Sequence, residues 1–156
     1  MFVFHGFGGI ATQFINSADM RDLAESNNFI VVYPQGLDLG GTGSHWNCSN
    51  PSADNKSDVD DIGFIENLID QLIVDYPVID SKRIYAAGYS NGGFMSYYLA
   101  CNSKKFAAIG SVAGTMLDDS YQSCNANFPT AMINIHGTND FDVPYDGNTY
   151  YPSIPE

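Results

Sequence analysis

Two kinds of apolar pattern alternate along this chain. Short continuous runs of Ile, Val, Phe and Ala are typical of buried strands, and segments in which apolar residues recur every three or four positions are typical of amphipathic helices. The runs predict strands at residues 2–4, 29–33, 84–87, 106–112 and 131–135. The helical spacing predicts helices at residues 12–27, 62–76 and 91–102. This alternation predicts an α/β fold, with a mostly parallel sheet covered by helices on both faces.

Two polar stretches interrupt the alternation of predicted strands and helices. Residues 35–57 form a long loop rich in Gly, Ser, Asn and Asp, and residues 117–129 form a second polar loop. Loops this long in compact domains are usually functional or disordered. Because the chain has 156 residues, no internal repeat and no linker, we expect residues 1–156 to form a single domain.

The charge balance narrows the range of partners. The chain has 18 acidic and 6 basic residues and a net charge of −12. Such a surface repels nucleic acid and anionic lipid, so we expect neither as a partner. No apolar run has the length of a membrane-spanning helix, and the first residues lack the charged region of a signal peptide. Asp60 and Asp61 have no histidine or third carboxylate at ligand spacing, so they predict helix capping and no metal site.

The strongest chemical signal is the sequence Gly-Tyr-Ser-Asn-Gly at residues 88–92, which lies between a predicted strand and a predicted helix. This context matches the G-x-S-x-G nucleophile elbow. The sharp turn holds Ser90 Oγ clear of the backbone, where a base and a substrate can both reach it. The helix N-terminus then directs N–H groups at the reacting carbon. Because a purely structural glycine-rich turn would fit the same five residues, the interpretation depends on the rest of the chain.

A second glycine-rich turn, residues 5–9, follows the first predicted strand directly. Acyl transfer develops an oxyanion that needs two N–H donors already in place. We expect these donors to be the backbone N–H groups of Phe7 and Asn91. His5 stands at the strand end, where we expect it to position the turn rather than act as a base.

A third turn, residues 136–144, follows the last predicted strand. A carboxylate at this place can orient a catalytic histidine and stabilise its charged form. Asp140 is our choice and Asp142 is the competitor, although either side chain could simply cap the turn. A serine followed by an acid matches the chain order of α/β-hydrolases.

Together these segments resemble the esterase and polyhydroxybutyrate depolymerase-like α/β-hydrolases, a family that includes feruloyl and acetylxylan esterases related to carbohydrate esterase family 1. The resemblance spans nearly the whole chain. It rests on residues 5–9, 33–36, 46–47, 60–64, 83–93, 106–108, 112–114 and 136–145. It implies that Ser90 is the nucleophile, that Asp140 is the triad acid, and that Phe7 and Asn91 form the oxyanion hole. It implies no cofactor.

The same resemblance has two further implications. The family commonly carries a disulfide at positions that match Cys101 and Cys124, which would leave Cys48 outside that bond. Three reduced thiols are the alternative, which a cytosolic location would favour. Because the family is largely secreted, the resemblance implies an extracellular or periplasmic location.

The chain departs from the family's pattern at the base. The family's catalytic histidine follows the acid, whereas His5, His45 and His136 all precede Asp140. The family also has strands before the one that opens this chain. We therefore expect the chain to be truncated at both ends and to hold the central part of the fold.

His45 is the alternative base, although it would need a different chain order. With Trp46 beside it, His45 is also a candidate for the substrate pocket, to which we assign His5 and Tyr89 as well. A loop anchored by one buried Trp46 would explain the same residues without a pocket.

The expected function is that of a serine esterase that works through an acyl-enzyme. Its substrates would be small-molecule or polymer esters, either hydroxyalkanoate oligomers or feruloyl and acetyl esters of plant polysaccharides. One alternative is a peptidase on the same fold, because an elbow and an oxyanion hole serve amides too. The other is a non-catalytic binding protein that kept the fold.

Overall fold

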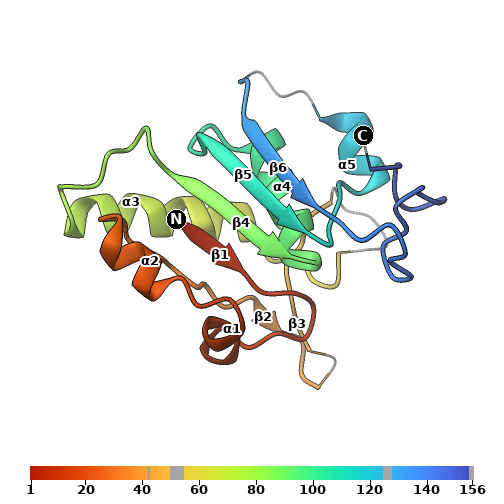
Figure 1. The fold of residues 1–156 in the computed structure, drawn as a ribbon, viewed down its shortest axis with the longest axis horizontal. Helices are drawn as coiled ribbons and strands as arrows, with labels where there is room; N and C mark the ends of the chain where they lie inside the picture. Colours follow the sequence, from red (N-terminus) through yellow and green to blue (C-terminus); the bar gives the residue numbers. More distant parts are fainter. Residues whose placement is uncertain (42, 50–54, 125–127, 155–156) are drawn as a thin grey trace.

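A four-stranded parallel sheet lies at the centre of the computed structural model, which describes residues 1–41, 43–49, 55–124 and 128–154. Its order is β1 (Phe2–Phe4), β4 (Tyr85–Tyr89), β5 (Ala108–Val112) and β6 (Ala131–Ile135), and all neighbours run parallel (Figure 1). Four of the five predicted strands are therefore confirmed: β1 and β6 have the predicted boundaries, and those of β4 and β5 differ by at most two residues. The carboxyl ends of β1, β4 and β6 lead directly into the three turns singled out in the sequence.

Helices α3 (Asp61–Asp75) and α4 (Asn91–Asn102) confirm two of the three predicted helices. Asp60 caps α3, since its carboxylate accepts the N–H of Gly63 at 2.8 Å. Helix α4 packs against β1, β4 and β5. Alternate residues of the two central strands, β4 and β5, are buried, as Ala86 and Ile109 show. The chain is thus α/β, as predicted.

Two short helices, α1 (Ala11–Ser17) and α2 (Arg21–Ser26), replace the single helix that the pattern predicts there. The Tyr33 hydroxyl donates to the carbonyl of Ala18 at 2.6 Å and accepts the N–H of Met20 at 3.0 Å. A continuous helix would need these backbone groups for its own hydrogen bonds. The prediction of one helix was wrong because a distant side chain competes for them.

The strand predicted at residues 29–33 is also absent. Only Val32 joins the sheet, through a single parallel bridge to Phe2. The Val3 N–H donates to Val32 O at 2.9 Å, and the Val32 N–H donates to Met1 O at 2.9 Å. Because β1 is only three residues long, this edge offers no longer ladder.

Each predicted loop contains short regular structure. Within the first, β2 (Leu37–Asp38) pairs antiparallel with β3 (Ser44–His45). Within the second, α5 (Asp118–Ser123) begins with two acidic residues, which favour a helix N-terminus. Among the described residues, no helix has the length and apolarity needed to cross a bilayer.

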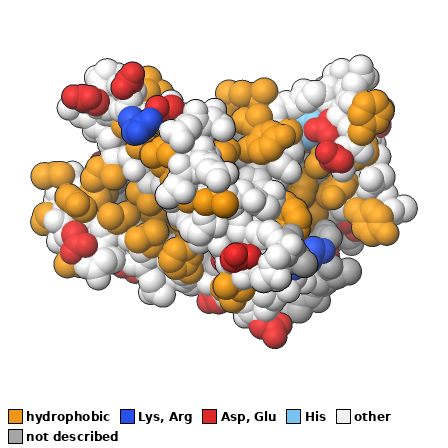
Figure 2. Space-filling model, turned by 90° about the horizontal axis from the view of Figure 1, so that it is seen from below, with side chains coloured by type: hydrophobic (Ala, Val, Ile, Leu, Met, Phe, Trp, Pro, Cys, Tyr) orange, Lys and Arg blue, Asp and Glu red, His pale blue; other side chains and the backbone are white. Residues whose placement is uncertain are grey.

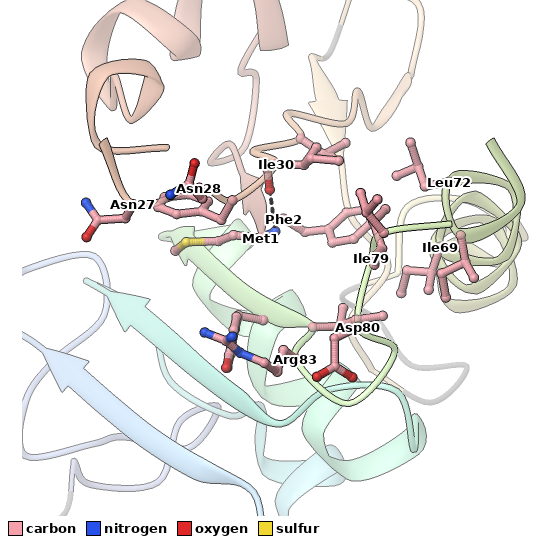
Figure 3. A pocket seen from close by; sticks show the side chains of 16 residues that line it. Met1, Phe2, Asn27, Asn28, Ile30, Ile69, Leu72, Ile79, Asp80 and Arg83 are labelled. Carbon is pink, nitrogen blue, oxygen red and sulfur yellow. Dashed lines mark hydrogen bonds between the residues drawn. The ribbon is translucent and has the colours of Figure 1, made fainter. Parts of the chain in front are cut away.

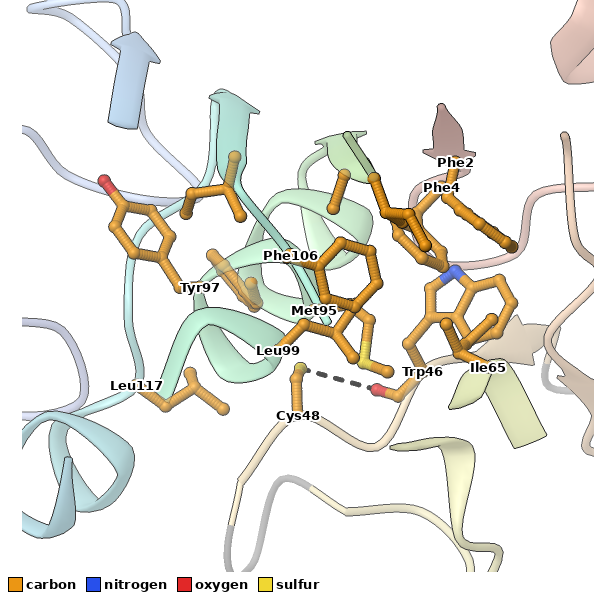
Figure 4. Packing of buried hydrophobic residues seen from close by; sticks show 14 of the residues in the cluster. Phe2, Phe4, Trp46, Cys48, Ile65, Met95, Tyr97, Leu99, Phe106 and Leu117 are labelled. Carbon is orange, nitrogen blue, oxygen red and sulfur yellow. Dashed lines mark hydrogen bonds between the residues drawn. The ribbon is translucent and has the colours of Figure 1, made fainter. Parts of the chain in front are cut away.

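The core lies between the sheet and helices α3 and α4 (Figure 4). Trp46, from the loop after β3, is fully buried and packs edge-on against Phe4 with ring centroids 5.2 Å apart. Ile65 of α3 and Met95 of α4 are fully buried in the same cluster. A residue of the long loop is therefore as much a part of the core as the strands are.

A disulfide joins Cys101, in the last turn of α4, to Cys124, which directly follows α5. The pairing that the family resemblance implied is present. Cys48 is buried in the core cluster.

A hollow of about 600 Å³ lies beside the amino-terminal end of β1 (Figure 3). Phe2, Asn28, Ile69 and Arg83 are among the residues that line it. The glycine-rich turn that follows β4 is at the other end of the strands, so this hollow is separate from the candidate site described next.

Candidate active site

Ser90 occupies a strained turn between β4 and α4. Its backbone has φ 51° and ψ −119°, a conformation that residues other than glycine rarely adopt. The strain is held in place from both sides: the Ser90 N–H donates to Val112 O at 2.8 Å, and the Phe94 N–H donates to Ser90 O at 3.0 Å. This is the strand–turn–helix geometry that a nucleophile elbow requires.

The motif glycines are required by close backbone contacts. A Cβ at Gly88 would lie 2.1 Å from the carbonyl oxygen of Gly92. A Cβ at Gly92 would lie 2.2 Å from the carbonyl oxygen of Phe4. Since no larger residue fits at either position, the strand, the helix and the end of β1 can converge on Ser90 only with this sequence.

His5 is a buried structural residue. Its Nδ1 lies 2.8 Å from Gly6 O and its Nε2 accepts the N–H of Gly36 at 3.0 Å. The acceptor role of Nε2 leaves the proton on Nδ1, which donates to Gly6 O. Burial lowers the pKa of His5 below its ordinary value, while the hydrogen bond to Gly6 partly offsets this effect. The positioning role expected for His5 agrees with these contacts.

Phe7 and Asn91, the expected oxyanion-hole residues, both line a hollow of about 190 Å³ together with Ser90. We call this space the Ser90 hollow. The described residues include no acceptor for the backbone N–H of either Phe7 or Asn91. Two backbone donors are therefore available beside the serine, as an oxyanion hole requires.

The acid-bearing turn after β6 is internally bonded. Asp140 Oδ1 accepts the N–H of Asp142 at 3.0 Å and the N–H of Val143 at 2.9 Å. His136 Nε2 is 2.8 Å from Val143 O and 3.6 Å from Asp140 Oδ2. Asp142 and Val143 line the Ser90 hollow, whereas Asp140 is not among its lining residues. The structure therefore brings both candidate acids to the serine's end of the sheet.

The predicted pocket residues divide into two groups. His45 lines the Ser90 hollow, and its ring contacts Phe7 with centroids 5.6 Å apart. Trp46 and His5 are fully buried, and Tyr89 is exposed; none of the three lines the hollow. Trp46 instead anchors the loop through its packing on Phe4, and the side chain of Tyr89 lies beside Gly6.

Sequence reasoning missed most of the apolar wall of the Ser90 hollow. Phe94, Leu117 and Tyr151 line it, and the rings of Phe94 and Tyr151 lie 5.6 Å apart. Phe94 stands four residues after Ser90, one helical turn along α4, and that spacing could have identified it. No local signal marks Leu117 or Tyr151, because their approach depends on how distant segments pack. Cys48 and Lys56, from the long loop, complete the lining.

The three histidines of the chain differ in their access to Ser90. Within the described ranges, no hydrogen bond reaches the Ser90 hydroxyl. His5 is occupied by Gly6 and Gly36, and the side chain of His136 is almost fully buried against Val143. Of the three histidines, only His45 faces the same hollow as Ser90.

The chain is similar in sequence to curated esterases. The chain is 33% identical over 125 residues to the "Bifunctional acetylxylan esterase/xylanase XynS20E" of Neocallimastix patriciarum, covering 79% of this chain and 16% of that protein. It is 30% identical over 154 residues to "Feruloyl esterase C" of Emericella nidulans, covering 94% of this chain and 50% of that protein. The chain thus spans half or less of the length of these curated relatives.

The fold is shared with solved structures. The acetyl xylan esterase from Aspergillus awamori superposes with a TM-score of 0.62 at 23% identity, covering 74% of this chain and 41% of that chain. This likeness establishes the α/β-hydrolase fold. Residues 17–124, which include the elbow, match the prolyl oligopeptidase family. That match covers more than half of the chain, so this protein belongs to the prolyl oligopeptidase family of α/β-hydrolases.

Proposed function

We propose that the chain carries the nucleophile, the oxyanion hole and the triad acid of a serine esterase. The observation that carries the proposal is the strained Ser90 at the edge of a hollow that also contains the available N–H groups of Phe7 and Asn91. The names of the curated relatives, acetylxylan and feruloyl esterases, support an ester as the substrate.

In the proposed reaction, Ser90 Oγ attacks the ester carbonyl carbon while a base takes the hydroxyl proton. The carbonyl oxygen becomes an oxyanion, which the N–H groups of Phe7 and Asn91 stabilise. Collapse expels the alcohol, which receives the proton, and leaves an acyl-enzyme that water hydrolyses by the same route in reverse. Asp140 would orient the base and stabilise its charged form. These steps need no cofactor.

We propose that the base is none of the three histidines of this chain and is supplied from outside residues 1–156. The buried contacts of His5 and His136 support this for those two residues. His45 is the competitor because it faces the Ser90 hollow. Replacing His45 with Gln in the full-length gene product should leave measurable turnover, whereas a loss as large as that of Ser90→Ala would make His45 the base.

The shape of the Ser90 hollow supports an aromatic acyl group. Its apolar wall contains Phe7, Phe94 and Tyr151, and its volume of about 190 Å³ far exceeds what an acetyl group fills. Aromatic walls with few polar groups are typical of small-molecule sites. We therefore propose feruloyl-type esters, with plant polysaccharide as the alcohol, ahead of acetyl esters and hydroxyalkanoate oligomers.

The test is a comparison of ester substrates on the full-length gene product. We expect kcat/KM for a feruloyl ester to exceed that for the matching acetyl ester by about tenfold or more, because pocket contacts give discrimination of that order. Ser90→Ala should lower kcat by about 10⁴ or more. The exposed Ser81→Ala is the matched control. An organophosphate should label Ser90; labelling elsewhere with Ser90→Ala still active would reject the proposal.

A peptidase is the second candidate, because the family that matches residues 17–124 is named for oligopeptidases. The same elbow and oxyanion hole can act on amides. A peptide anilide assayed beside the feruloyl ester separates the two. Faster turnover of the anilide would favour the peptidase, and Ser90 labelling without turnover of either substrate would favour a binding protein.

We also propose an extracellular or periplasmic location. The disulfide between Cys101 and Cys124 supports it, since such bonds persist mainly in oxidising compartments. Fractionation of the source cells, with detection of the oxidised protein outside the cytosol, tests this. Recovery of the protein in the cytosol with both thiols reduced would reject it.

A further inference from the structure

The long loop contributes His45 and Cys48 to the lining of the Ser90 hollow, and we call this part of the lining the loop wall. The side chain of Asn91 holds the loop wall close to the nucleophile. Its Oδ1 accepts the N–H of Trp46 at 2.8 Å, and its Nδ2 donates to the carbonyl of Trp46 at 3.0 Å. The carboxamide thus pairs with both backbone groups of one residue, as a neighbouring strand would. Asn91 is only 4% exposed, so these bonds lie in a low-dielectric environment where they are hard to replace by water.

The residue that Asn91 holds is itself fixed from its other side. The indole N–H of Trp46 donates to His5 O at 3.1 Å, and its ring packs against Phe4. Trp46 is therefore clamped between the end of β1 and the first residue of α4. Its side chain contributes to the core and its backbone faces the elbow.

The loop residues on either side of Trp46 form part of the hollow. His45 and Cys48 both line it, and Cys48 Sγ lies 3.4 Å from Asn91 Nδ2. Any shift of Trp46 away from Asn91 would move this wall away from Ser90. Two hydrogen bonds from the Asn91 side chain thus help to set the separation between this wall and the nucleophile.

We propose that the Asn91 carboxamide is a positioning group that sets acyl-group selectivity, separately from the backbone N–H that serves the oxyanion hole. This inference rests on the proposed esterase function. The carboxamide acts through the wall, so a bulky acyl group that reaches the wall depends on it and an acetyl group does not. Every substitution except proline keeps the backbone N–H, which allows the two roles to be separated.

The first experiment uses Asn91→Ala and Asn91→Asp in the full-length gene product. Aspartate keeps the acceptor for the Trp46 N–H but cannot donate to the Trp46 carbonyl. We expect kcat/KM to fall more for a feruloyl ester than for the matching acetyl ester, by about tenfold or more in Asn91→Ala. The ratio should fall by a smaller factor in Asn91→Asp. Asn102→Ala, at the far end of the same helix and exposed, is the matched control and should leave the ratio unchanged.

A proportional loss on both esters would overturn the proposal, because it would mean that the carboxamide only supports folding. If the parent protein hydrolyses neither ester, the esterase proposal fails. A second measurement then still tests the contact in the unsubstituted protein: hydrogen exchange at the Trp46 amide. We expect protection comparable to that of the amides within α4. Exchange at the rate of an unprotected amide would show that Asn91 does not hold the wall.

Discussion

At the scale of the residue, backbone contacts leave no room for side chains around Ser90. A Cβ atom at Gly88 or Gly92 would overlap a neighbouring carbonyl oxygen. Ser90 itself has a positive φ, which residues other than glycine rarely adopt. The strain is local, and two hydrogen bonds, one to β5 and one from α4, maintain it. Such strain persists where the surrounding structure over-determines it, which is typical of active sites.

Replacing Gly88 with Ala should destabilise the protein by forcing β4 and α4 apart at the elbow. The new methyl would lie 2.1 Å from Gly92 O, so strand and helix must move apart. We expect a loss of about 3 kcal/mol or more in unfolding free energy, at the upper end of overpacking effects. Gly137→Ala is the control, because nothing lies within 4 Å of its Cβ position. Urea unfolding measures both, and equal stabilities would contradict the packing argument.

Asp61 carries a buried carboxylate whose ionisation opposes folding. Burial raises its pKa to about 6, and the nearby Asp60 adds to the effect, while the N–H of Asn47, which donates to Asp61 at 2.7 Å, partly offsets it. The folded state therefore binds the Asp61 proton more tightly than the unfolded state does. Stability from this group is fully present below about pH 4 and is lost as pH rises to about 6.

Asp61→Asn should remove this pH dependence. Asparagine keeps an acceptor for the Asn47 N–H but carries no charge. We expect the variant to gain about 1–2 kcal/mol over the wild type at pH 7.5 and little at pH 4, with the difference developing between pH 4 and 6. The exposed Asp58→Asn is the control. Denaturant unfolding of both proteins at pH 4 and pH 7.5 measures the difference in stability. A gain of the same size at both pH values would show that the pH dependence does not come from Asp61.

At the scale of the element, α5 is held to the site from two directions. The disulfide joins its end to the end of α4, and the Ser120 hydroxyl donates to Cys48 O at 3.1 Å. Leu117, which directly precedes α5, lines the Ser90 hollow. A six-residue helix is too short to be stable alone, so these tertiary links maintain it.

Removing the disulfide with Cys101→Ser and Cys124→Ser together should destabilise the protein. The bond closes a loop with a sequence separation of 23, for which loop entropy predicts about 3 kcal/mol. Thermal unfolding with and without reductant measures the effect. Reductant should lower the midpoint temperature of unfolding of the wild type and leave that of the double variant unchanged. A wild type whose midpoint does not change with reductant would show that the disulfide does not contribute to stability.

At the scale of the whole molecule, the described sheet ends in an apolar edge. Met132, Ile133 and Ile135 of β6 are exposed, with 63% of Ile133 accessible. Figure 2 shows further apolar side chains on the surface seen from below. Exposed edge strands of this kind invite pairing between molecules.

The 156-residue chain made alone should therefore associate in solution. It should also turn over esters poorly, because we propose that the base is supplied from outside residues 1–156. Ile133→Lys should weaken the association, because a charge on an edge strand opposes pairing. Val78→Lys is the control, since Val78 is exposed away from β6. Sedimentation over a range of concentrations provides the measurement. A chain that stays monomeric at all concentrations would refute the prediction, and full ester turnover would make His45 the first base to test.

The sequence by itself determined the features that depend on neighbouring residues. Strand β1, helix α4 and the glycine-bounded turn at Ser90 follow from apolar spacing and from the absence of Cβ atoms, both of which act within a few residues. The end of β6 was equally clear, so the acid-bearing turn could be located.

Only the tertiary structure decided which of these residues meet. The interruption between α1 and α2 depends on Tyr33, and the burial of Trp46 depends on Phe4 and Asn91. Tyr151 reaches the Ser90 hollow from the far end of the chain. Such contacts join segments tens of residues apart, and their energies depend on how the segments pack rather than on any periodicity. The elbow was therefore predictable, whereas the wall that surrounds it was not.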